Sequence, residues 1–305
     1  MNELPLVSII VISYNQEAYI RENLDSIKSQ SYANIELIVA DDASEDNSRK
    51  IFEQWLTENN YVANRNFHSK NTGVVTILNE CIEMATGEYI KIIAADDFLH
   101  ENAIEKCISE LENLGDDYGM IYTDAYTINE KSKIQADIMD CTALYNADSE
   151  KFYDLLVLRN RILALSVVMR TSVLVETGVY DDKFIVEDYC RWLKIAQLYK
   201  IAYIPEKLAF YRWHNSNVTI LKADRIKKDD ISLKIMFDRN GIARNVIRNY
   251  LIKERIQKNK IDTEILKSYN KYSYRNKVLA ASLIQTGFIY IPLSFVYRKL
   301  NKLMK

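Results

Sequence analysis

Residues 88–97 read EYIKIIAADD, an apolar stretch that ends at two adjacent carboxylates, Asp96 and Asp97. The stretch is short and rich in isoleucine, which favours a buried parallel strand over a helix. Two like charges side by side raise each other's pKa, and this costs free energy unless a cation or a hydroxyl-bearing ligand lies between them. The stretch therefore predicts a buried strand that ends either in a solvated loop or at a binding site.

The same pattern, a buried strand followed by a carboxylate pair, occurs earlier, where IELIVA precedes Asp41 and Asp42. Strand-like and helix-like periodicities alternate through this part of the chain. We expect Ser44 to cap the helix that follows Asp42, because its oxygen can accept from the first backbone N–H groups. The other expected elements are strands at 6–13, 35–40, 61–69 and 88–95 and helices at 17–30 and 73–85. Such alternation predicts a parallel sheet covered by helices on both faces, with ligands at the carboxyl ends of its strands.

The second half of the chain is less regular. The expected elements are strands at 119–128 and 161–170, an amphipathic helix at 187–200, and two short strands around Pro205 within 201–214. The pattern beyond these elements is helical, polar and basic, with no strong strand signal.

Charge divides the chain into two parts. The net charge is −2, but residues 221–305 carry 20 Lys and Arg against 7 Asp and Glu, and the other 220 residues carry 20 basic and 35 acidic side chains. This asymmetry predicts a first domain at 1–220 and a basic helical extension at 221–305, with different partners.

Cysteine usage and the first residues favour a cytoplasmic protein. The four cysteines are scattered without metal-ligand spacing, and the first residues lack the basic and long apolar regions of a signal peptide. The chain contains neither a P-loop nor a dinucleotide-binding glycine motif. We expect no nucleic-acid partner, because the acidic first part would repel a phosphate backbone.

Three segments resemble, in the right order, family 2 glycosyltransferases of the nucleotide-diphospho-sugar (GT-A) type. They are VSIIVISYNQEAYIRENLDSIKSQSYANIELIVADDASEDNS, NTGVVTILNECIEMATGEYIKIIAADD and EDYCRWLKIAQLYKIAYIPEKLAFYRWHNSN. The resemblance covers about residues 5–217. It implies an α/β fold of the GT-A type, a mostly parallel sheet flanked by helices, here with a C-terminal helical extension.

The chain departs from the family pattern at a few positions. Ala95-Asp96-Asp97 lacks the leading aspartate of a full DxD metal motif, and Leu78 stands where many relatives have arginine before Asn79. The second departure leaves one phosphate contact unassigned. The tryptophan motif and the multiple membrane spans of processive synthases are also missing from the sequence, which implies transfer of one sugar per encounter.

The resemblance implies a role for each candidate residue. Tyr14 would stack on the nucleobase, Asp42 would accept the uracil imide N–H, and Asp188 would be the general base that takes the proton of the acceptor hydroxyl. The implied donor-binding residues are Ser13, Tyr14, Asn15, Asp42, Asn71, Asp96, Arg212 and His214, and the implied ligands of Mn²⁺ or Mg²⁺ are Asp97 and His214.

Plainer interpretations of these residues stay open. Tyr14 could pack on the next helix, and Asp41 could belong to a solvated turn. Glu187 is also a suitable acid for the start of a helix, because negative charge is favoured there. His214 could simply pack beside Trp213.

The implied activity is that of an inverting, metal-dependent, non-processive hexosyl- or N-acetylhexosaminyl-transferase. It would move one sugar from a nucleotide-diphosphate donor, a UDP-sugar, to an acceptor hydroxyl during synthesis of a bacterial capsule, lipopolysaccharide or exopolysaccharide. The acceptor would be a glycan or a lipid-linked glycan. The alternatives are a sugar-phosphate nucleotidyltransferase, whose glycine-rich loop is replaced here by SYNQEAY, and a non-catalytic nucleotide-sugar-binding module.

Residues 278–297 form an uncharged stretch with basic residues on both sides. Basic flanks beside apolar and aromatic side chains suit the surface of an anionic leaflet. The stretch therefore predicts peripheral attachment of 221–305 to the inner face of the cytoplasmic membrane, with packing on the first domain and a helix that spans the bilayer as the alternatives.

Overall fold

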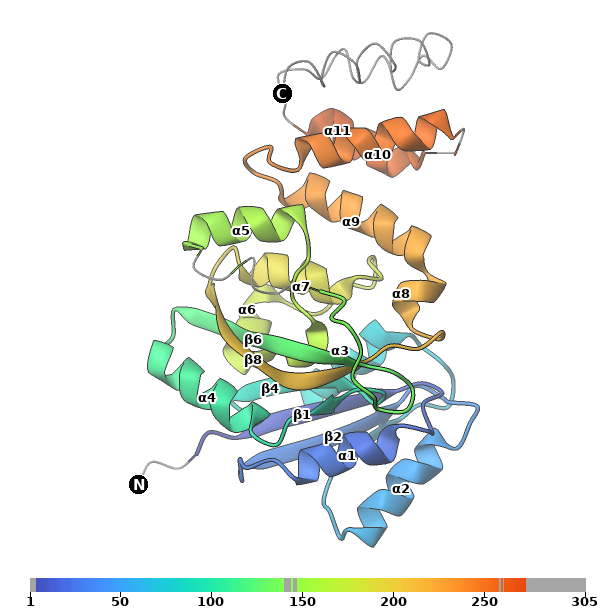
Figure 1. Ribbon diagram of the computed structural model, residues 1–305, viewed down its shortest axis with the longest axis vertical. Coiled ribbons are helices and arrows are strands. Elements are labelled where there is room, and N and C mark those ends of the chain that lie inside the picture. The colour runs from blue at the N-terminus through green and yellow to red at the C-terminus, as the bar shows by residue number, and fades with distance from the viewer. Residues whose placement is uncertain (1–3, 140–143, 145–146, 258, 260, 273–305) are drawn as a thin grey trace. The chain divides into compact units, whose positions relative to one another are not determined.

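The computed structural model describes residues 4–139, 144, 147–257, 259 and 261–272. Its central element is a sheet with the strand order β3-β2-β1-β4-β7-β6-β8-β5 (Figure 1). The strands are β1 (Val7–Ser13), β2 (Ile35–Asp41), β3 (Asn64–Phe67), β4 (Tyr89–Ala94), β5 (Phe98–Leu99), β6 (Tyr118–Ile128), β7 (Val168–Arg170) and β8 (Lys200–Arg212).

Helices connect most of these strands. Those before β8 are α1 (Ile20–Lys28), α2 (Ser48–Glu58), α3 (Val74–Met84), α4 (Ala103–Leu114), α5 (Ser149–Leu158), a 3-10 helix (Ala164–Ser166), α6 (Thr171–Thr177) and α7 (Glu187–Ile195). Those after β8 are α8 (Val218–Leu221), α9 (Ala223–Phe237), α10 (Arg244–Ile256) and α11 (Thr263–Lys271).

The strands are mostly parallel, as predicted. β3, β2, β1 and β4 form three parallel pairs, and β6 runs parallel to β8. The short strand β7 joins the two groups and is antiparallel to both of its neighbours, and β5 is antiparallel to β8. This architecture confirms the predicted α/β fold with a helical C-terminal part.

The alternation of side chains along β1 allows one strand to serve two layers of helices. Val7, Ile9 and Val11 belong to a core formed with α1, α2 and α4. Ile10 is equally buried but points to the other face, where α3 packs on β1 and β2 (Figure 1). A buried strand needs apolar residues on both faces, and this explains the continuous apolar runs in the sequence.

The predicted strand at 161–170 was wrong over most of its length, because only its last three residues are a strand. The buried ammonium of Lys91 lies against the carbonyls of Leu165 and Val167. Carbonyls that accept from Lys91 do not take part in a sheet ladder there. The segment therefore forms a 3-10 turn before β7.

The two short strands predicted around Pro205 are one long strand, β8. Its ladder with β6 skips residues at this point, since Thr123 pairs with Ile204 and Asp124 pairs with Lys207. Proline has no N–H to donate, so it is accommodated at such an irregularity. The helix predicted at 187–200 ends earlier, at Ile195.

The chain divides into two compact units. One consists of the described residues of 1–149 and 161–221, and the other of those of 150–160 and 222–305. The segment 150–160 was expected to belong to the first domain. No helix among the described residues has the length and apolar character needed to span a bilayer, and the stretch 278–297 lies outside these residues.

Gly87 provides a test of how closely β1 and β4 are joined. A Cβ at this position would lie 2.6 Å from the backbone nitrogen of Ser8 and 2.8 Å from the carbonyl oxygen of Leu6. Backbone atoms of a buried strand cannot move aside cheaply, so we expect Gly87→Ala to lower the free energy of unfolding by about 1–3 kcal/mol. Urea unfolding should show this loss for Gly87→Ala and not for Glu83→Ala on the exposed side of α3. Equal stability of the two variants would contradict the close packing.

Candidate active site

The site lies at the carboxyl ends of β1, β2 and β4. Ser13 pairs with Asp41 across the β1–β2 ladder, and the N–H of Ala95 donates to the carbonyl of Ile12 at 2.9 Å. β1 has β2 on one side and β4 on the other, so the order of the strands reverses at this point. Ligands of open α/β sheets bind at such a reversal.

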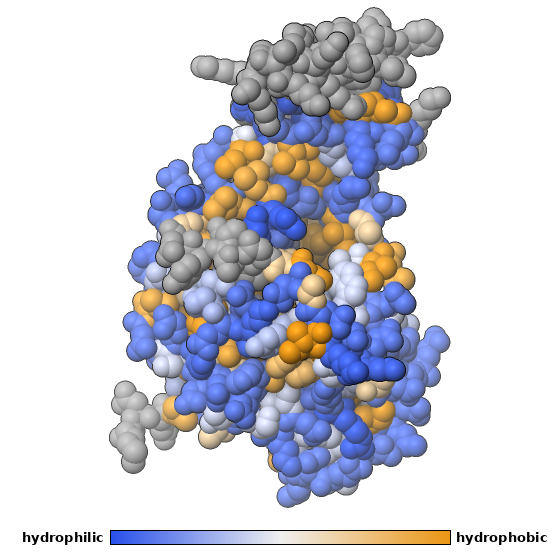
Figure 2. Space-filling model, viewed as in Figure 1, coloured by the Kyte–Doolittle hydropathy of each residue, from blue (hydrophilic) through white to orange (hydrophobic). Residues whose placement is uncertain are grey.

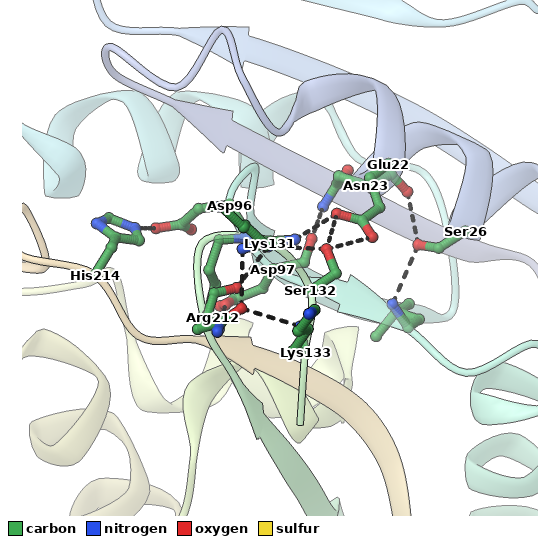
Figure 3. Close-up of polar contacts among 12 residues, drawn as sticks. Glu22, Asn23, Ser26, Asp96, Asp97, Lys131, Ser132, Lys133, Arg212 and His214 are labelled. Atoms are coloured by element: carbon green, nitrogen blue, oxygen red, sulfur yellow. Dashed lines mark hydrogen bonds and ion pairs between the residues drawn. The ribbon is translucent and has the colours of Figure 1, made fainter. Parts of the chain in front are cut away.

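The two carboxylates of the opening stretch face different partners. Asp96 Oδ2 lies 3.0 Å from His214 Nε2, and the other ring nitrogen of His214 lies 2.9 Å from Ser216 Oγ (Figure 3). Asp96 and His214 are only 7% and 8% exposed. The structure thus brings these two predicted site residues into direct contact.

Asp97 is directed toward the protein interior. Its Oδ1 accepts the backbone N–H of Arg212 at 2.8 Å, and its carbonyl accepts from the amide of Asn23. Burial and the neighbouring charge of Asp96 raise the pKa of Asp97 well above its ordinary value. This geometry argues against the expected role of Asp97 as a metal ligand, because its carboxylate joins β8 to the turn and does not face His214 (Figure 3).

Arg212 was expected to contact the diphosphate, but its guanidinium is 1% exposed and engaged within the protein. Nε donates to the carbonyl of Asp96 at 2.7 Å, and Nη1 donates to the carbonyl of Asn129 and the hydroxyl of Ser132, both at 3.0 Å. Nη2 pairs with the carboxylate of Glu22. All three nitrogens therefore hold the site together, and the expected contact of Arg212 with the diphosphate stays a prediction.

Asp42 fixes the loop that precedes α3. Its carboxylate accepts the N–H groups of Thr72 and Gly73, each at 2.8 Å, and lies 2.9 Å from His68 Nδ1. Burial raises the pKa of Asp42, but the hydrogen bonds from Thr72, His68 and Gly73 outweigh it and hold the pKa below the ordinary value. Asn71 donates to the Asp42 carbonyl at 3.2 Å. At 3% exposure the Asp42 carboxylate is engaged with these groups, and its contact with a uracil ring stays a prediction.

The residues that leave β1 are held by the loop after β2. The backbone N–H of Asn15 donates to Ser44 Oγ at 2.8 Å, and Ser44 in turn donates to Asp41 at 2.5 Å. Ser44 is therefore not the N-cap of α2, which begins after Asn47. Tyr14 is 46% exposed beside this clamp, and no hydrogen-bond partner of the buried Ser13 hydroxyl is found in the described part of the chain.

Asp188 lies in the first turn of α7, as predicted. Its Oδ1 accepts the backbone N–H of Tyr189 at 2.6 Å. Burial raises the pKa of Asp188, and burial together with the charge of Asp188 raises that of Glu187. Burial also raises the pKa of Tyr211, with smaller contributions from the charges of Asp97, Asp96 and Asp188. The charges of these three carboxylates therefore act on one phenol on β8.

Several residues of the site were missed in the sequence. Tyr19, Glu22 and Asn23 come from the start of α1, and Tyr211 comes from β8. One signal was present: Asn23 is a polar residue on the apolar face that Ile20, Leu24 and Ile27 define. A buried amide needs hydrogen-bond partners, and these are the carbonyls of the turn that carries Asp96.

A protein-family model described as glycosyl transferase family 2 matches residues 8–173. The chain belongs to this family. This membership confirms that the protein is a glycosyltransferase, the enzyme class that the resemblance implied.

Bacterial members of the family are similar along different lengths of this glycosyltransferase. An uncharacterized glycosyltransferase of Rickettsia felis is 31% identical over 216 residues, which are 69% of this chain and 35% of the relative. An uncharacterized glycosyltransferase of Haemophilus influenzae is 28% identical over 305 residues, covering 93% of this chain and 91% of the relative. The chain thus spans about a third of the first relative and nearly all of the second.

Solved structures share the fold of this glycosyltransferase. Residues 1–349 of S. aureus TarS superpose with a TM-score of 0.62 at 16% identity, covering 96% of this chain and 91% of that one. A mannosyltransferase of Pyrobaculum calidifontis, PcManGT, in complex with GDP-Man and Mn²⁺, gives a TM-score of 0.60 at 18% identity, covering 99% and 84%.

The loop before α3 should depend on pH through His68. Burial lowers the pKa of His68, but its contacts with Glu80 and Asp42 outweigh this and raise it. A raised histidine pKa contributes stability that is complete below the unfolded value, about 6.5, and is lost as pH rises through the folded value. We expect His68→Gln to cost about 0.5–1 kcal/mol at pH 6 and less at pH 8.5, since partial exposure screens the charges.

Urea unfolding at both pH values measures this difference, with His100→Gln as the control. A loss that is the same at pH 6 and pH 8.5 would show that the imidazolium does not stabilise the loop.

Proposed function

We propose that the chain is an inverting, metal-dependent glycosyltransferase that uses a nucleotide-diphosphate sugar, preferentially a UDP-sugar. The observation that supports this most directly is the pairing of Asp96 with His214 at the switch point of the sheet, together with Asp188, an acid of raised pKa in the first turn of α7. Asp96 and His214 are suited to the diphosphate and its cation, and Asp188 is suited to the acceptor.

Asp96 and His214 fit a divalent cation as its protein ligands. They offer a carboxylate oxygen and an imidazole nitrogen 3.0 Å apart, a donor set that suits Mn²⁺ or Mg²⁺. Among the described residues no group of three or more His, Cys, Asp or Glu side chains forms a metal site. We therefore assign the cation to Asp96 and His214 in place of Asp97, with diphosphate oxygens and water as its further ligands. When bound, the cation would neutralise negative charge on the leaving diphosphate.

The nucleotide would occupy the end of β1. Tyr14 is exposed there and offers a ring for stacking on a base, while Ser13 and Asn15 flank it. Asn71 supports the adjoining loop through the Asp42 carbonyl. TarS has been solved with UDP and with UDP-GlcNAc, and PcManGT with GDP-Man, which supports a nucleotide-sugar donor.

Asp188 would act as the general base. As the acceptor oxygen bonds to the anomeric carbon, the hydroxyl proton passes to the Asp188 carboxylate, and the bond to the diphosphate breaks with its electrons leaving on oxygen. Attack from the face opposite to the leaving group inverts the anomeric centre. A pKa raised by burial brings the carboxylate closer to the pH at which a base works best.

The acceptor class is proposed from the enzyme family, and the location at the membrane is proposed from the charge of residues 221–305. The resemblance to family 2 glycosyltransferases implies a role in surface-glycan synthesis, with a glycan or lipid-linked glycan as acceptor. The excess of basic residues in 221–305 supports peripheral attachment to an anionic membrane surface. Such attachment would bring the enzyme to an acceptor carried on a lipid.

Donor hydrolysis tests the proposal and the choice of metal ligand together. We expect a panel of UDP- and GDP-sugars to show Mn²⁺-stimulated release of UDP, because water can replace the acceptor. Asp96→Asn should weaken Mn²⁺ binding by about 10-fold or more, since it removes a charged ligand. Asp97→Asn should keep most of the binding, because an amide oxygen can still accept the N–H of Arg212. Loss of Mn²⁺ binding in Asp97→Asn alone would reverse the assignment.

The role of Asp188 is tested by separating chemistry from binding. We expect Asp188→Asn to lower kcat by about 10²–10⁴ and to leave the Kd for UDP unchanged, because the base acts only on the acceptor. The parent should lose activity as pH falls through the raised pKa of Asp188, above the ordinary range for aspartate. Asp182→Asn, which changes an exposed carboxylate in the same loop, is the matched control. A parallel loss of UDP affinity in Asp188→Asn would make it a binding residue.

A further inference from the structure

Tyr19 lies between the two residues that join β8 to the site. Its ring stacks on the imidazole of His214, with ring centroids 5.6 Å apart and an interplanar angle of 21°. The Arg212 guanidinium lies over the same ring, 4.5 Å from its centroid. Tyr19 therefore touches the histidine of the Asp96–His214 pair and the arginine that holds the carbonyl of Asp96.

The position of Tyr19 is itself fixed by the start of α1. Its N–H donates to the carbonyl of Gln16 at 3.0 Å, and its carbonyl accepts from Asn23 at 3.1 Å. The next turn supplies Glu22 to Arg212, and Asn23 to the carbonyls of Ala94 and Asp97. The start of α1 thus holds both sides of the pair: the turn that carries Asp96, and the face of the His214 ring.

The imidazole needs such a support because its last torsion is soft. Rotation about the bond to a planar ring has broad minima, so hydrogen bonds at the ring edge alone hold its plane weakly. The edge contacts of His214 are Asp96 at Nε2 and Ser216 at Nδ1. A parallel aromatic neighbour restricts the ring to the plane in which Nε2 points at Asp96.

We propose that Tyr19 is a positioning residue: its ring holds the imidazole of His214 in the plane that directs Nε2 to Asp96, and so prepares the pair for a divalent cation. The positioning follows from the contacts of Tyr19 with His214 and Arg212 and from the pairing of His214 with Asp96. The expected effect of Tyr19 on the binding of a divalent cation rests on the proposed function. The phenyl ring carries the effect, so phenylalanine should replace tyrosine and an aliphatic side chain should not.

The positioning is measured by NMR of the full chain labelled with ¹⁵N at its three histidines. His214→Gln identifies the signals of His214. In the parent at pH 8 we expect separate ¹⁵N shifts for Nδ1 and Nε2, since each nitrogen has a fixed partner. Tyr19→Leu should move the two shifts toward a common average, whereas Tyr19→Phe should keep the parent spectrum.

Tyr61→Leu is the matched control, because it removes a ring that packs at a tilt against Trp55, with centroids 5.5 Å apart, outside the Asp96–His214 pair. Urea unfolding establishes that each variant is folded, and Tyr19→Met provides the same comparison if the leucine variant is not. An unchanged His214 spectrum in a folded aliphatic variant overturns the proposal.

Electron paramagnetic resonance measures Mn²⁺ binding without any nucleotide. This measurement distinguishes a failure of the positioning role of Tyr19 from a failure of the proposed metal site. Tyr19→Leu and His214→Gln should each weaken binding by about 10-fold or more, and Tyr19→Phe should not. If the parent binds Mn²⁺ and Tyr19→Leu binds it equally well, the positioning role is overturned. If the parent binds no Mn²⁺, the metal assignment fails, and the NMR comparison still decides the role of Tyr19.

Discussion

Burying the guanidinium of Arg212 removes a full charge from water, which costs several kcal/mol unless each nitrogen finds a partner. The partners come from three parts of the chain: Glu22 in α1, the carbonyl of Asp96 after β4, and the turn at Asn129 and Ser132 after β6. These segments must converge for the charge to be satisfied. The same convergence places Asp96 and His214 side by side, because both are neighbours of these contacts.

The buried guanidinium of Arg212 also helps to explain how the adjacent carboxylates of Asp96 and Asp97 are tolerated. Asp97 gives its carboxylate to the N–H of Arg212, while Asp96 turns to His214. Both residues follow the end of β4, and their carboxylates take different partners, one in the interior and one in the site. Burial and the repulsion from Asp96 still raise the pKa of Asp97, and the N–H and the charge of Arg212 oppose that shift.

Most of the parallel strands, and the edge of the sheet where the carboxylates lie, could be predicted because apolar runs and carboxylates recur in register with the sheet. The sequence also carries a signal for α4, which was not among the expected elements: Ile104, Cys107, Ile108 and Leu111 are spaced for one helix face. Which aspartate of a pair faces inward could not be predicted, because it depends on partners such as Arg212 that are distant in sequence. The same holds for Asp42, whose partners Thr72 and Gly73 belong to another loop.

The pairing of Asp96 with His214 implies that cation and donor bind together. Mn²⁺ and Mg²⁺ prefer about six ligands, and this pair would supply two of them. The diphosphate would bring further oxygens, so the ion should bind more tightly when the donor is present. Linkage then requires that the ion raise the affinity for the donor by the same factor. A residue that fixes the plane of His214, as Tyr19 does in this proposal, would therefore influence the nucleotide sugar without touching it.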